Sequence, residues 1–195
     1  MTLGRPKEFD RKEALESAME VFWAKGFADA TVRDLLEGMG INRGSMYDTF
    51  GDKRALFLAA IDHYRQEVAG PLVEGLSAPG SPLENIRKTL SRLAEAAGTK
   101  ECRGCLITNV TVEIAPHDPE VARAMKSALT HTEAALRKTL DRAVEEGEIN
   151  AKADTRALAR FLLNTMQGLV VLGKAKLGKK TSSDVIEVAM AALAA

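Results

Sequence analysis

The stretch that decides the fold is residues 31–51, which read TVRDLLEGMGINRGSMYDTFG. Thr31 and Asn42 are residue types favoured as helix N-caps, and a glycine, typical of helix ends, follows each helical stretch. The pattern therefore predicts two short helices, 31–39 and 43–49, joined by a glycine-containing turn. Such a pair, preceded by a supporting helix, makes a helix-turn-helix.

The supporting helix is predicted at residues 11–25. Asp10 can cap its N-terminus, and Gly26 can end it. Its apolar residues recur at helical spacing and define one buried face, which consists of Leu15, Ala18, Met19 and Phe22. The sequence thus supplies the element against which the two short helices pack.

The second short helix has the character of a recognition helix, which must be short, braced from behind and exposed at its N-terminal residues. Met46 and Phe50 can anchor it to the other two helices. The side chains left pointing outward are those of Arg43, Ser45 and Tyr47.

The rest of the chain also predicts helices, because no β-branched run of period two is bounded by turn residues. We expect an all-α fold of nine helices, with a loop at residues 77–82 where prolines and glycine cluster. The expected ranges are 11–25, 31–39, 43–49, 53–68, 83–97, 105–115, 119–147, 155–177 and 183–194.

Charge alone does not indicate a nucleic-acid partner. The 27 Lys and Arg residues balance 27 Asp and Glu residues, and residues 1–54 hold nine basic against ten acidic side chains. Only residues 1–12 are locally basic, and within them Arg5 and Lys7 could reach an adjacent DNA groove as an arm. A DNA-binding function must therefore depend on where the cations lie, not on how many there are.

Composition predicts a cytoplasmic protein. Apolar residues make up 46% of the 195, no apolar run reaches membrane-spanning length, and the N-terminus lacks the apolar stretch of a signal peptide. Two cysteines exclude a disulfide framework. The sequence predicts no cofactor and no membrane partner.

The N-terminal residues resemble the signature of TetR-family transcriptional repressors over positions 10–57. The stretches that carry the resemblance are Phe22-Trp-Ala-Lys-Gly-Phe27, Ala30-Thr-Val-Arg-Asp-Leu-Leu36 and Gly40-Ile-Asn-Arg-Gly-Ser-Met-Tyr-Asp-Thr-Phe50, followed by Lys53 and Leu56. The resemblance implies a helix-turn-helix DNA-binding domain at 1–52, with its recognition helix at about 43–49. It also implies a helical effector-binding and dimerisation domain at 53–195.

By position, the resemblance implies contacts to double-stranded DNA from both short helices. Arg43 would read guanine through a bidentate contact, or else bind a phosphate. Lys53 would form an ion pair with a phosphate, and Thr31 would offer its hydroxyl to another. The full set of implied DNA-binding residues is Thr31, Arg43, Gly44, Ser45, Tyr47, Thr49 and Lys53.

The chain departs from the family pattern at several positions. Leu36 and Met39 stand where alanine is usual, so the inner face of the motif must pack differently. Gly38 within a two-turn helix costs up to ~1 kcal/mol relative to alanine. Asp48 either reads a cytosine amino group or faces solvent.

Cys102 and Cys105 have the spacing of a redox or metal motif. A zinc site would need two further ligands, and no second pair of this kind exists, so no metal is predicted. We expect Cys105 to open a helix, where backbone N–H groups and Arg103 would favour its thiolate. Cys105, resolved by Cys102, is thus a candidate redox sensor; the alternative is an inert, partly buried thiol.

The C-terminal half is expected to bind a small-molecule effector and a second copy of the chain. The segment 158–172 is apolar nearly all round, with Gly168 and Gly173 allowing close approach. Both of its sides must therefore be covered, one by its own bundle and the other by a second subunit. The predicted dimer interface is Phe161, Leu162, Met166, Leu169, Val170, Ile186, Met190 and Leu193. The predicted effector-binding residues are Asn109, Glu113, Met125, Asn164 and Gln167.

These features predict a ligand-responsive DNA-binding regulator, a repressor that binds a near-palindromic operator as a homodimer and is not an enzyme. The position of the operator decides between repression and activation. Two alternatives remain: a thiol oxidoreductase that uses Cys102 and Cys105, and a helical protein-interaction module.

Overall fold

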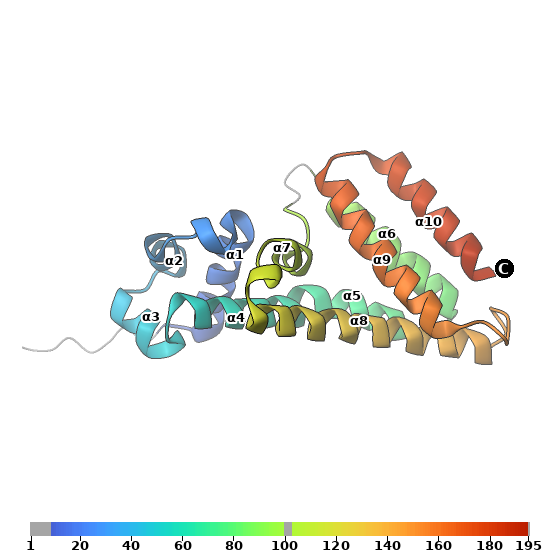
Figure 1. The fold of residues 1–195 in the computed structure, drawn as a ribbon, viewed down its shortest axis with the longest axis horizontal. Helices are drawn as coiled ribbons and strands as arrows, with labels where there is room; N and C mark the ends of the chain where they lie inside the picture. Colours follow the sequence, from blue (N-terminus) through green and yellow to red (C-terminus); the bar gives the residue numbers. More distant parts are fainter. Residues whose placement is uncertain (1–8, 100–102, 195) are drawn as a thin grey trace, which may run out of the picture. The chain divides into compact units, whose positions relative to one another are not determined.

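The computed structural model describes residues 9–99 and 103–194, and these are almost entirely helical, with no strand among them (Figure 1). The chain divides into two compact units, Met1–Glu67 and Val68–Ala195. This division falls later than the boundary after residue 52 drawn from the sequence, because the helix that begins at Lys53 packs against the first helix. No helix of the described part combines the length and apolar character needed to cross a bilayer.

The N-terminal unit contains four helices: α1 (Arg11–Asp29), α2 (Val32–Met39), α3 (Arg43–Phe50) and α4 (Lys53–Tyr64). Each begins at the N-cap that local sequence favours, because a side-chain oxygen accepts a hydrogen bond from a first-turn N–H. These caps are Asp10, Thr31, Asn42 and Asp52. Gly26 interrupts α1 with a φ of 76°, a conformation that favours glycine, as its predicted role as a helix end required.

An aromatic core holds α1 and α4 together. The ring of Phe57 packs edge-on against Phe22, with 5.0 Å between centroids, and in a tilted arrangement against Phe27, with 4.7 Å between centroids. Leu35 of α2 and Met46 of α3 are fully buried alongside. The short helices are therefore braced from behind by side chains of the same unit.

Gly38 allows α2 to approach α1 closely, which accounts for a glycine inside a two-turn helix. A Cβ at this position would lie 2.7 Å from Cγ2 of Val21 on α1. The helix-propensity cost inferred from the sequence is therefore accompanied by closer packing between the two helices.

The chain stays helical from Lys53 to Ser77, where the sequence predicted a helix ending near residue 68. A π-helical turn (Arg65–Ala69) leads into a short helix, α5 (Gly70–Glu74), and then into a 3-10 turn (Gly75–Ser77). Pro71 does not end the helical path, because it lies in the first turn of α5, where proline needs no N–H partner. With α5 included, the described residues form ten α-helical segments, nine of them at the expected places.

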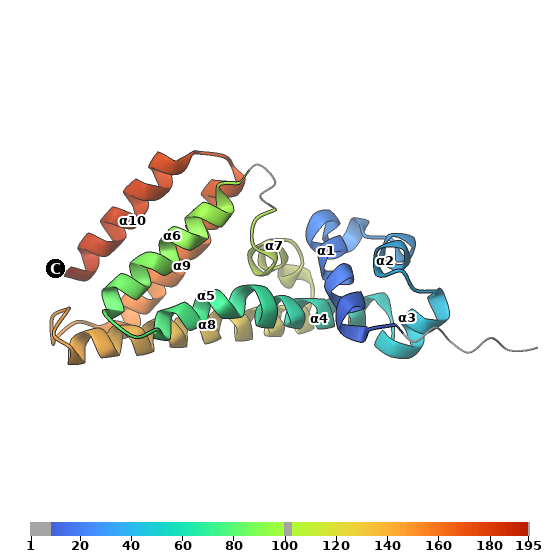
Figure 2. The same cartoon turned by 180° about the vertical axis from the view of Figure 1, so that it is seen from behind.

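The second unit also contains α6 (Pro82–Ala97), α7 (Leu106–Glu113), α8 (Pro119–Glu145), α9 (Thr155–Lys174) and α10 (Lys179–Ala194). Helices α6, α9 and α10 pack against one another, and α8 packs against α6 and α9 (Figures 1 and 2). Their shared core includes Leu90, Leu136, Leu140, Leu162, Leu169 and Ile186.

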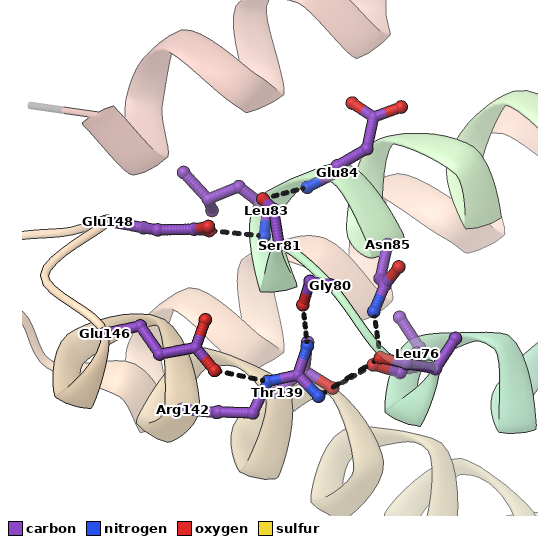
Figure 3. A network of polar contacts seen from close by, with 11 residues as sticks. Leu76, Gly80, Ser81, Leu83, Glu84, Asn85, Thr139, Arg142, Glu146 and Glu148 are labelled. Atoms are coloured by element: carbon purple, nitrogen blue, oxygen red, sulfur yellow. Dashed lines mark hydrogen bonds and ion pairs between the residues drawn. The ribbon is translucent and has the colours of Figure 1, made fainter.

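Polar contacts fix the connection between α5 and α6 onto α8 (Figure 3). The guanidinium of Arg142 donates to the carbonyl oxygens of Ala78 (3.2 Å) and Gly80 (2.8 Å), and its Nε forms an ion pair with Glu146 at 3.3 Å. The amide of Asn85 donates to the same Ala78 oxygen. This loop is therefore held through its backbone carbonyls.

Candidate nucleic-acid interface

Helix α3 has one buried and one outward face, as the sequence predicted. Met46 is fully buried and Phe50 is 8% exposed, whereas Tyr47 is 39% exposed. The other exposed residues of this helix are Arg43, Gly44 and Asp48, and Ser45 and Thr49 are half-buried. The outer face is thus available to a partner along the whole helix.

Arg43 and Tyr47 form a pair at the start of α3. The guanidinium of Arg43 lies over the Tyr47 ring, 5.7 Å from its centroid, in a cation–π contact between residues one turn apart. The cap beneath them is well formed, since the Ser45 N–H donates to Oδ1 of Asn42 at 2.9 Å. Both outward side chains are therefore positioned before any ligand arrives.

Thr31 is exposed, but its polar groups are directed at Asp34. Its N–H and its hydroxyl donate to Oδ2 of Asp34 at 2.9 and 2.8 Å, and its oxygen accepts from the Asp34 N–H. Asp34 also contacts Lys25 of α1 at 2.7 Å. The Lys25 hydrogen bond, followed by those from Thr31, lowers the pKa of Asp34 to about 2.

Asp34 was not predicted from the sequence, although its spacing from Thr31 is that of a capping box and could have identified it. In the structure, the Thr31 hydroxyl caps α2, whereas the resemblance assigned it to a phosphate.

Lys53 begins α4 and is half-buried. Its ammonium lies 4.6 Å from the centroid of the Phe27 ring and donates to the carbonyl oxygen of Ala28 at 3.5 Å. Neither partner carries a charge. Lys53 thus keeps its positive charge at the edge of the motif. The other predicted cations, Arg5 and Lys7 of the N-terminal arm, lie outside the described residues.

The predicted effector-binding residues fall into three settings. Asn109 of α7 and Gln167 of α9 lie where these helices meet: the Thr108 hydroxyl donates to Gln167, and the Lys174 ammonium donates to Asn109 at 3.1 Å. Met125 is buried in α8, and Glu113 and Asn164 are exposed. A single binding site for all five remains a prediction.

Cys105 is a free, half-buried thiol at the N-cap position of α7, one residue before the helix starts. Gly104 precedes it with a φ of 75° and lies against Asn109 and Lys174. Cys102 lies outside the described residues. Among those described, no cluster of three His, Cys, Asp or Glu side chains could hold a metal ion.

Most residues assigned to a dimer interface instead belong to the core of a single chain. Their side chains are at most 7% exposed, because α9 packs on α6, α8 and α10 of the same chain and α10 packs on α6 and α9; they are Leu162, Met166, Leu169, Val170, Ile186, Met190 and Leu193. Phe161 is 39% exposed. Gly173 likewise lies against Ala97 of the same chain, whereas a Cβ at Gly168 would meet no atom within 4 Å.

Comparisons with known proteins match both units. The family described as "Bacterial regulatory proteins, tetR family" matches residues 14–60, and "Tetracyclin repressor-like, C-terminal domain" matches residues 82–190. The HTH-type transcriptional regulator YezE of Bacillus subtilis is 37% identical over 98% of this chain and 100% of its own length. The repressor ComR of Escherichia coli is 30% identical over 86% of this chain and 81% of its own.

A solved structure extends the match to a DNA complex. A cysteine-substituted form of the TetR family transcriptional regulator CifR, complexed with a 26-base-pair operator duplex, superposes with a TM-score of 0.86. It is 30% identical, and the match covers 97% of this chain and 100% of that one. All of these relatives are transcriptional regulators. The chain therefore belongs to the TetR family of DNA-binding transcriptional regulators.

Proposed function

We propose that this regulator is a homodimeric repressor that binds a near-palindromic operator and is released from it by an effector. The observation that carries the proposal is the outward face of α3, which is braced by Met46 and presents Arg43 and Tyr47 on a capped N-terminus. Such an operator would be met in the cytoplasm of bacteria such as those from which the relatives YezE and ComR come. Its regulator relatives favour this function over a thiol oxidoreductase or a protein-interaction module.

On the operator, the N-terminal end of α3 enters the major groove. Arg43 makes the bidentate contact to guanine, and Gly44 and Ser45 let the backbone approach the bases. Tyr47 and Thr49 hydrogen-bond the sugar-phosphate backbone, and Lys53 binds a phosphate at the start of α4. To do so, the Lys53 ammonium has only to leave a 3.5 Å contact with a carbonyl oxygen.

The dimer forms through the outer faces of α9 and α10. Phe161 and Val171 of α9 and Val188 of α10 are 39%, 52% and 68% exposed, and Gly168 leaves open space beside them. Burying apolar side chains of this kind favours association. A two-fold axis would then set the two recognition helices about one DNA turn apart, ~34–36 Å.

The effector acts on the second unit, as a small molecule or as an oxidant. Cys105 supports the redox case, because oxidation there would place a bulkier polar group at the N-cap of α7. That helix is joined to α9 by the Thr108–Gln167 and Asn109–Lys174 hydrogen bonds. An effector that binds more tightly to the conformation unable to bind DNA lowers operator affinity, and the size of the effect is set by the difference between its affinities for the two conformations.

Selection of bound duplexes from random DNA, followed by fluorescence anisotropy, tests the function. We expect one enriched palindrome; Tyr47→Ala and Lys53→Ala weaken binding to all sequences, whereas Arg43→Ala flattens the preference among bases. A pool with no enriched sequence would contradict the proposal. In the same assay, peroxide should release the wild-type protein and not Cys105→Ser; equal release of both would exclude the cysteine sensor.

A further inference from the structure

Seven cations among the described residues of the N-terminal unit are held in two different ways. One group pairs with carboxylates of the same unit: Lys12 with Glu67 at 2.9 Å, Lys25 with Asp34 at 2.7 Å, Arg33 with Glu37 at 2.8 Å, and Arg65 with Asp62 at 3.1 Å. In each pair the carboxylate holds the Lys or Arg side chain in place and also neutralises its positive charge. These side chains have little net charge to offer a phosphate.

A second group is held by aromatic rings. The cationic groups of Arg11, Arg43 and Lys53 lie 5.3, 5.7 and 4.6 Å from the ring centroids of Phe50, Tyr47 and Phe27. In the described part of this unit, none of the three is paired with a carboxylate. A ring attracts a cation through its quadrupole and leaves the full charge in place. Two of the three, Arg43 and Lys53, already belong to the proposed DNA contacts.

Arg11, the third member, received no role from the sequence. Its ring partner, Phe50, is the last residue of α3, and the Phe9 ring packs on the same ring at 6.5 Å. Arg11 therefore lies at the C-terminal end of the recognition helix, opposite Arg43 at its start. When the N-terminal residues of such a helix read bases, its other end is nearer the backbone that borders the groove.

We propose that Arg11 binds a phosphate of the operator backbone from its position on the Phe50 ring; the proposal rests on the operator binding proposed above. Residues 1–54 hold one more acidic than basic side chain, so only cations with uncancelled charge can replace DNA counterions. Packing on the ring also limits the side-chain freedom that Arg11 loses on binding. Its exposed position leaves room for the phosphate.

The salt dependence of binding tests this proposal. The wild type, Arg11→Gln, Arg11→Lys and Arg33→Gln are titrated at several salt concentrations against the selected duplex and a mixed-sequence duplex. Arg11→Gln should reduce the slope of log affinity against log salt by about 0.9 per subunit on both duplexes, as expected for one lost phosphate contact. Arg11→Lys should keep the slope, because it keeps the charge.

Arg33→Gln is the matched control, since it removes an exposed cation that Glu37 neutralises, and it should keep the wild-type slope. An Arg11→Gln protein that binds more weakly with an unchanged slope would show a structural role and overturn the proposal. So would equal slope losses in Arg11→Gln and Arg33→Gln. A wild type without salt-dependent binding to either duplex would instead refute the proposed DNA-binding function itself.

Discussion

Two arginines of the N-terminal unit are held by aromatic rings, whereas three of the C-terminal unit are held by carbonyl oxygens or carboxylates. In the N-terminal unit, Arg11 and Arg43 lie on aromatic rings and keep their charge exposed. In the C-terminal unit, Arg142 donates to two backbone carbonyls, and Arg160 and Arg87 pair with Glu133 and Glu187. The C-terminal arginines are neutralised or hydrogen-bonded by their own fold, whereas the proposed DNA contacts Arg11 and Arg43 have no carboxylate partner among the described residues of their unit.

The two units also differ in what their closely packed glycines contact, and this difference gives the largest expected effect on stability. A Cβ at Gly173 would lie 2.6 Å from the backbone oxygen of Ala97, whereas the nearest atom to a Cβ at Gly38 would be a side-chain methyl carbon of Val21, and the Ser17 backbone oxygen would lie at 3.9 Å. Gly173→Ala must push α9 from α6, so we expect unfolding free energy to fall by about 2–3 kcal/mol. Urea denaturation at one protein concentration measures it.

Gly38→Ala is the matched control for that substitution. The contact is with one methyl group of Val21, which must shift, and the gain of ~1 kcal/mol in helix propensity offsets part of that strain. We therefore expect stability within about 1 kcal/mol of the wild type. Equal losses from both substitutions would contradict the distinction between a backbone contact in the bundle and a side-chain contact in the helix-turn-helix.

An intermediate effect is expected from Arg142→Gln. The substitution leaves the carbonyl oxygens of Ala78 and Gly80 without their guanidinium donor, so unfolding free energy should fall by about 1–2 kcal/mol. Arg137→Gln removes an exposed arginine, 3.7 Å from Asp141 on the same helix, and should cost less than about 0.5 kcal/mol. Equal effects in urea denaturation would mean that the loop does not depend on Arg142.

The N-terminal unit was predictable because its signals are local. The N-caps Asp10, Thr31 and Asn42 each act within three residues, so the sequence alone places the starts of α1, α2 and α3. The buried face of α3 follows from helical spacing in the same way. The outward direction of Arg43 and Tyr47 is a consequence of both.

The remaining features depend on contacts between residues far apart in the chain. The ring beneath Arg11 belongs to Phe50, and the helix that covers Gly173 contains Ala97, neither of which local spacing reveals. For the same reason the sequence could not say which side chains of the apolar segment 158–172 face a second subunit: Leu162 and Leu169 were assigned to the dimer interface, but their own bundle buries them. Apolar character predicts that a side chain is buried but does not say by which subunit.

The smallest effect concerns Asp34, the carboxylate that joins α2 to α1 and whose pKa lies at about 2. A carboxyl with a lowered folded-state pKa stabilises the fold above its unfolded value, here 3.8, and that contribution is lost as pH falls through about 2. Lys25→Met removes the largest cause, so the pKa should rise yet stay below 3.8, because both Thr31 hydrogen bonds remain.

NMR titration of the Asp34 carboxyl carbon measures this pKa directly. Thermal unfolding should show the wild type losing stability between pH 4 and pH 2, Lys25→Met losing less over that window, and Asp34→Asn losing least. The exposed setting of the ion pair keeps these differences small. If Lys25→Met left the Asp34 titration unchanged, Lys25 would be as free as Arg11 and would join the cations available to DNA. That result would contradict the separation of carboxylate-paired from ring-held cations, from which the phosphate contact of Arg11 was inferred.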